Sequence, residues 1–73
     1  MTGTYSQDFI EKKIETFEYY APYESIKELE MAAIRLHYLY GDSIEKIQVI
    51  TGLYGDNHFE RLFRLFLAHI NES

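Results

Sequence analysis

The stretch that decides the fold is residues 43–70, which read SIEKIQVITGLYGDNHFERLFRLFLAHI. Its second half carries apolar side chains three or four residues apart, the spacing of one face of an α-helix. They are Phe59, Leu62, Phe63, Phe66 and Ile70. Leu65 falls near the polar side, which is unusual for a helix with one buried face. The pattern predicts an amphipathic helix after Gly55, with Asp56 or Asn57 as its N-cap.

The first half of the same stretch predicts a shorter helix. Its apolar positions are three residues apart, at Ile44, Ile47 and Ile50. Ser43 suits the N-cap, and Gly52 ends the helix because glycine adopts a positive φ without a Cβ clash. A short helix, a glycine-containing turn and a longer amphipathic helix outline a helix-turn-helix-like corner over residues 43–70.

Residues 43–64 resemble the second helix-turn-helix of the AraC/XylS family of bacterial transcription regulators. In that family a glycine follows an aliphatic position by five residues, and a Phe-x-Arg-aliphatic-Phe-basic run lies further on. The residues in this register are Ile44, Ile47, Gly52, Leu53, Phe59, Arg61, Leu62, Phe63 and Arg64. The resemblance implies a DNA-binding surface. In it Tyr54, Asn57 and His58 would reach base edges, and Arg61 or Arg64 would lie near phosphate.

The sequence also departs from the family pattern. Gln48 stands where the family has a small alanine, and Gly55-Asp56 replaces its usual acid and polar residue. Residues 1–42 are too few for the family's first helix-turn-helix and its linker. The chain therefore corresponds at most to a half-module.

Two further helices are predicted upstream. In the first, Ile10, Ile14 and Phe17 recur at i, i+4 and i+7. We expect it to run from an N-cap at Ser6 to near Tyr20, because Pro22 disfavours helix at the residue before it.

The second upstream helix should start at residues 23–25 and end at Tyr40, before Gly41. Its wide apolar face predicts a central helix that touches others on more than one side. The fold class is therefore all-α: a small bundle of about four helices whose last two form the corner. Residues 1–5 should be a flexible N-terminal tail, and residues 6–71 a single helical domain.

The charge of the chain disfavours direct binding to duplex DNA. Seven basic side chains stand against 12 acidic ones, for a net charge of -5. Residues 34–73, which carry the corner, hold four basic and five acidic residues, so even this half is not positive. Lysine and arginine contacts to phosphate supply most non-specific affinity for nucleic acid. We therefore prefer a protein partner, such as a DNA-binding repressor or activator, and keep DNA as the alternative.

A surplus of aromatic and acidic side chains points to the same class of partner. Aromatic residues make up 16% of the chain, more than a domain of 73 residues easily buries. Tyrosine is enriched in protein interfaces, and an acidic surface would attract a basic, DNA-binding partner. The predicted partner-binding residues are Tyr19, Tyr20, Tyr23, Tyr54, Glu11, Glu15, Glu18 and Leu65. Tyrosines packed around a small core with their hydroxyls in water are the simpler reading of each one alone.

Self-association is a further possibility, because Leu65 and Leu67 could form the seam of a homodimer. Taken together, the sequence predicts a small acidic regulatory binding protein of the cytoplasm, of the kind found in phage or plasmid switches.

Enzymatic chemistry has little support in the sequence. There is no cysteine, no glycine-rich phosphate loop and no nucleophile spaced with a base. His58 and His69 would lie ~16 Å apart along one helix, too far to share a metal ion. His37 is expected at the surface or in an interface. No apolar run approaches the ~18 residues of a membrane span. We therefore predict no enzyme, no metal and no cofactor.

Overall fold

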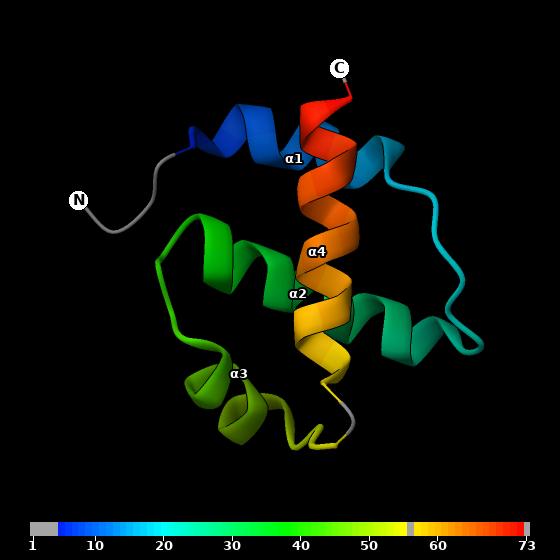
Figure 1. Cartoon of the computed structure of the whole chain (residues 1–73), viewed down its shortest axis with the longest axis vertical. Helices are drawn as coiled ribbons and strands as arrows, with labels where there is room; N and C mark the ends of the chain where they lie inside the picture. Colours follow the sequence, from blue (N-terminus) through cyan, green and yellow to red (C-terminus); the bar gives the residue numbers. More distant parts are fainter. Residues whose placement is uncertain (1–4, 56, 73) are drawn as a thin grey trace.

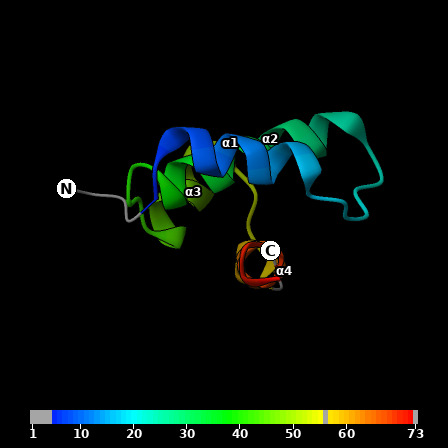
Figure 2. The same ribbon diagram turned by 90° about the horizontal axis from the view of Figure 1, so that it is seen from above.

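A computed structural model describes residues 5–55 and 57–72 of the chain. This part folds into four α-helices and contains no β-strand, which confirms the predicted all-α class. The helices are α1 (Gln7–Thr16), α2 (Glu24–Tyr38), α3 (Ile44–Thr51) and α4 (His58–Asn71). In Figure 1, α4 runs across α1 and α2. Figure 2 looks along α4 and shows the other three helices on one side of it.

The core lies where α4 crosses the other helices. All five residues of the predicted α4 stripe are buried. They meet a second set from the other three helices and the segment after α1, namely Ile10, Ile14, Phe17, Ala33, Ile34 and Ile47. As predicted, α2 is central, because it contacts α1, α3 and α4. Burying these apolar side chains is the main stabilising term of so small a domain.

The first helix is shorter than predicted, because it ends at Thr16 instead of near Tyr20. Its N-cap is Ser6, as expected, with the side-chain oxygen accepting a hydrogen bond from the Phe9 N–H at 3.2 Å. Phe17 leaves the helix in an extended conformation, with a ψ of 110°. Its ring is buried edge-on against Phe66 of α4, with 5.1 Å between ring centroids. A tertiary contact, and not Pro22, therefore ends α1.

The other helix ends agree with the prediction in most places. The second helix ends at Tyr38, two residues before the predicted Tyr40, and Gly41 follows with a φ of 74°. Ser43 caps α3 by accepting a hydrogen bond from the Lys46 N–H at 3.2 Å. Gly52 ends α3 with a φ of 73°.

Asn57, one of the two predicted N-cap residues, occupies the N-cap position of α4. Asn57 precedes α4 in the left-handed conformation, and its side chain makes no capping hydrogen bond. Asp56, the other predicted cap, lies outside the described residues.

The predicted corner is present as two contacting helices joined by residues 52–57. This connection is longer than the turn of about three to four residues that joins the helices of a typical helix-turn-helix. At the other end of the chain, Tyr5 differs from the predicted tail. Its ring stacks on Phe9 at 5.6 Å and meets Tyr38 edge-on at 5.9 Å, so the packed domain starts one residue earlier than predicted.

Candidate functional site

The segment of residues 17–23, between α1 and α2, positions the main candidate site. Its first part is extended, and in an extended chain successive side chains point to opposite sides. Phe17 and Tyr19 therefore share the inward side, where their rings stack with centroids 4.5 Å apart. Glu18 and Tyr20 point outward and are exposed. Because α1 ends early, Tyr19 is half-buried and Tyr20 is 88% exposed.

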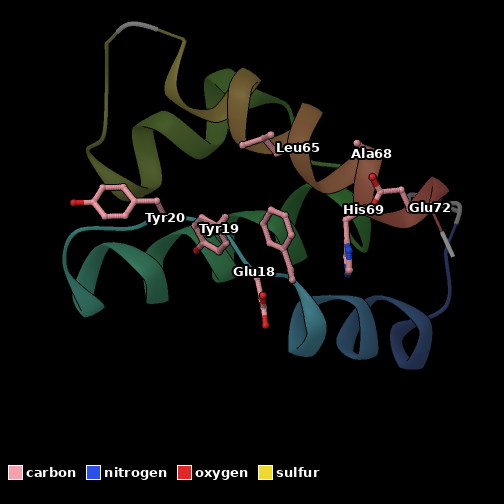
Figure 3. Close-up of a pocket in the computed structure, with 8 residues that line it drawn as sticks. Glu18, Tyr19, Tyr20, Leu65, Ala68, His69 and Glu72 are labelled. Carbon is pink, nitrogen blue, oxygen red and sulfur yellow. The ribbon is translucent and has the colours of Figure 1, made fainter.

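A hollow of about 330 Å³ lies between this segment and α4 (Figure 3). Its lining comes from both elements and consists of Phe17, Glu18, Tyr19, Tyr20, Leu65, Ala68, His69 and Glu72. The polar side chains in this lining include the carboxylates Glu18 and Glu72, and it contains no lysine or arginine. Leu65, the apolar residue that the α4 pattern left near its polar side, is exposed here and contributes to the wall.

His69 ties the ends of α1 and α4 together beneath this hollow. Its Nε2 lies 2.9 Å from the Thr16 hydroxyl oxygen, and its ring lies against Phe17 with centroids 5.6 Å apart. These contacts hold the end of α1 against the last turn of α4, so they fix the two elements that line the hollow relative to each other.

A second hollow of about 330 Å³ continues along α4 toward its N-terminus. It is lined by Tyr19, Tyr20, Glu30, His58, Arg61, Leu62 and Leu65. Three of these residues, Tyr19, Tyr20 and Leu65, also line the first hollow. We call the two hollows together the tyrosine groove.

The only buried charged residue in the described part of the chain, Glu30, lies under the second hollow. It is 5% exposed, and its Oε2 lies 3.1 Å from Nε2 of His58. Burial raises the pKa of Glu30 above its ordinary value, and His58 opposes that shift.

Tyr19 lies next to this pair, with its hydroxyl donating to the Lys27 carbonyl at 3.4 Å. Burial and the nearby Glu30 charge raise the pKa of Tyr19 to about 12. Tyr19 therefore stays neutral at physiological pH, and it lines the groove as a neutral aromatic side chain.

Four of the eight predicted partner-binding residues meet in the tyrosine groove: Glu18, Tyr19, Tyr20 and Leu65. Tyr23 and Tyr54 are exposed but line neither hollow, and Glu15 is exposed on α1. Glu11 differs from the other predicted acidic residues in having an ion-pair partner within the described chain, although its side chain stays partly exposed. It accepts hydrogen bonds at 2.7 and 2.9 Å from Arg35 of α2, which lowers the pKa of Glu11.

The residues predicted for DNA contact lie in different environments, because most are exposed and one contacts a buried carboxylate. Arg61 and Arg64 are exposed on α4, as Asn57 is just before it. Tyr54 is exposed in the connection between α3 and α4. His58 instead points to Glu30, so the same ring does not project freely toward a base edge.

His37, predicted at the surface or in an interface, is half-buried and lines a separate surface hollow. Its ring stacks on Phe63 with centroids 4.3 Å apart, and its Nδ1 lies 3.0 Å from the Asp42 carbonyl oxygen. The histidine therefore closes the turn between α2 and α3. No group of three or more metal-ligating side chains gathers in the described part of the chain.

Sequence reasoning missed Glu30, His69 and Glu72 as parts of the site. Glu30 is one of several carboxylates in the first half of the chain, and nothing in its spacing marks it as buried.

Comparisons of the sequence with family models and with curated proteins, and of the structure with solved structures, give no match. Within residues 5–55 and 57–72, no helix has the length and apolar character needed to cross a bilayer.

Proposed function

We propose that this protein is a small regulatory binding protein that modulates transcription in the cytoplasm by occupying a DNA-binding partner protein. The observation that carries the proposal is the convergence of Glu18, Tyr19, Tyr20 and Leu65 on one groove. Tyrosine and leucine side chains there offer apolar area, and the first hollow adds two carboxylates and no lysine or arginine. Such a surface suits the basic face of a DNA-binding protein, and its occupation would compete with DNA.

The experiment compares two exposed leucines of α4. Leu65 lines the tyrosine groove, whereas Leu67 lines a separate hollow with His37 and Tyr38. The wild type should capture a DNA-binding protein from the host, and the purified complex should release that protein's DNA. Leu65→Glu should abolish both capture and release, and Leu67→Glu should preserve them. Equal behaviour of the two variants would contradict the groove as the contact surface.

Direct DNA binding is the second candidate. Exposure of Arg61 and Arg64 on α4 favours it, together with the resemblance of residues 43–64 to a helix-turn-helix. In that reading a dimer would place one α4 on each half-site. Exposed Glu60 lies between these arginines and the start of α4, where it would repel phosphate. For this reason the protein-partner function ranks first.

A further inference from the structure

The partner that the tyrosine groove takes can be specified more closely from the chemistry of its lining. This step rests on the proposed function, because it concerns the same surface. Three properties decide it: where negative charge lies, where an aromatic face is uncovered, and where an apolar wall stands.

Negative charge is concentrated in the first hollow. Glu18 and Glu72 both line it, both are exposed, and neither forms an ion pair within the described chain. Glu72 is also the C-cap of α4, where the carbonyl end of a helix adds partial negative charge. In the second hollow, by contrast, the single carboxylate is that of Glu30, which lies beside the His58 ring. A cationic group is therefore favoured at the Glu18 and Glu72 end.

The aromatic rings add a second attraction for a cation. The ring of Tyr19 already has a cation over its face, because Nζ of Lys27 lies 5.9 Å from the ring centroid. Tyr20 is 88% exposed, so its ring faces are open to a partner. Cations are attracted to the face of a tyrosine ring, and the planar guanidinium of arginine stacks on it especially well.

Leu65 supplies the apolar contact, and it belongs to both hollows. Along α4 it lies seven residues before Glu72, a separation of ~10 Å by helix rise. Three residues of chain in the polyproline II conformation span about that distance, and because this conformation has three residues per turn, side chains three apart lie on the same face. A bound segment in this extended conformation would thus bring an apolar side chain to Leu65 and a basic side chain, three residues away, to the acidic end.

We propose that the tyrosine groove recognises an extended segment of a partner protein in which an arginine or lysine lies three residues from an aliphatic side chain. The aliphatic side chain packs against Leu65 and Tyr20, and the basic side chain reaches the carboxylate of Glu72, while Glu18 adds negative charge to the same hollow. The acidic charge of the chain as a whole would speed the encounter with such a segment.

The test uses three synthetic peptides in an NMR titration of the intact protein at low ionic strength. The first is acetyl-Gly-Ser-Leu-Gly-Ser-Arg-Gly-Ser-amide. The second replaces its arginine with glutamate, and the third replaces its leucine with serine. Only the first should shift backbone amides, and the shifts should be confined to residues 17–20 and 58–72. Equal binding of the glutamate peptide, or shifts centred elsewhere, would overturn the proposal.

Matched charge variants separate recognition from net charge. Glu18→Gln with Glu72→Gln should weaken binding of the arginine peptide by roughly tenfold, because the two substitutions remove both exposed carboxylates of the first hollow. Glu28→Gln with Glu45→Gln changes net charge equally at exposed positions away from both hollows, and should leave binding unchanged. Equal losses in the two pairs would contradict a specific site. Circular dichroism confirms that all variants stay helical.

Failure of this inference can be told apart from failure of the proposed function. If the arginine peptide does not bind but Leu65→Glu still abolishes capture of the partner, the recognition chemistry is wrong and the function stands. If the peptide binds as described but Leu65→Glu leaves capture intact, the groove is a basic-segment site, and the proposed function is wrong.

Discussion

Oε2 of Glu30 in α2 lies 3.1 Å from Nε2 of His58 in α4, beneath the tyrosine groove, and the two form an ion pair only when the imidazole is protonated. The glutamate side chain is almost fully buried, whereas the histidine keeps 38% of its side-chain surface exposed. The other Glu30 oxygen, Oε1, is buried without a hydrogen bond of ordinary geometry. A buried carboxylate carries a desolvation penalty, which a single histidine offsets only in part. The pair therefore holds α4 against α2, but it lowers the free energy of unfolding.

We expect Glu30→Gln to become more stable, relative to wild type, as pH rises. The folded pKa of Glu30 is raised above its ordinary value of 4.5. A raised carboxyl pKa contributes stability that is fully present below the unfolded pKa and is lost as pH rises through the folded pKa. Glutamine never ionises, so it avoids this loss. Urea denaturation of both proteins below pH 4.5 and near neutral pH measures the difference, and a gap that shrinks with rising pH would contradict the burial argument.

The Glu11–Arg35 pair should show the opposite pH dependence. Arg35 lowers the folded pKa of Glu11, so its contribution is present above the ordinary value of 4.5 and is lost as pH falls through the lowered value. Both side chains are more than a third exposed. Glu11→Gln should therefore cost only about 0.2–1 kcal/mol at neutral pH and nothing in strong acid. The same urea titrations measure it, with Glu15→Gln as the unpaired control on the same helix.

Phe17→Ala should destabilise the domain and open the tyrosine groove. Phe17 is buried between Tyr19 and Phe66, and loss of a buried phenylalanine costs about 3–5 kcal/mol. A domain of this size is stable by only about 4–11 kcal/mol, so much of the margin would disappear. Exposed Tyr23→Ala on the same segment should change stability by about 0.5 kcal/mol or less. Thermal unfolding followed by circular dichroism compares the two, and similar midpoints would show that Phe17 does not anchor the segment.

Arg64→Ala should leave capture of the protein partner intact, because Arg64 lies outside the tyrosine groove, and the double variant Arg61→Ala with Arg64→Ala tests duplex binding. Both residues are exposed on α4, and only Arg61 lines the groove, at the end opposite Glu72. The wild type should bind mixed-sequence duplex weakly, because few phosphate contacts are available to a chain of net charge -5. Fluorescence anisotropy across a salt series measures this. Tight duplex binding that falls steeply with salt and vanishes in the double variant would favour the DNA-binding alternative.

Most of the fold could be predicted from local patterns. Ser6 and Ser43 mark helix starts because a side-chain oxygen there satisfies a free backbone N–H, and Gly52 marks an end because it tolerates positive φ. The apolar stripe of α4 predicts its own burial, since a period near 3.6 places those side chains on one face. These features depend on neighbours within a turn or two of the helix, which is why the sequence alone carries them.

Half of the candidate site could be predicted in the same way, as a surplus of tyrosine and of acidic charge. The sequence alone could not say which members meet. Phe17 leaves the helix because Phe66, 49 positions away along the chain, offers it a buried contact, and that exit turns Tyr19 inward and Tyr20 outward. The packing of α2 against α4 likewise buries Glu30 and pairs it with His58.

By itself, then, the sequence determined the helices, their caps, the buried stripe and the sign of the charge, because each depends on residues close together in the chain. Only the tertiary structure decided where α1 ends, which carboxylates are paired and which side chains share the tyrosine groove. Those outcomes depend on contacts between residues far apart in sequence, whose free energies override local helical preference and which no local period records.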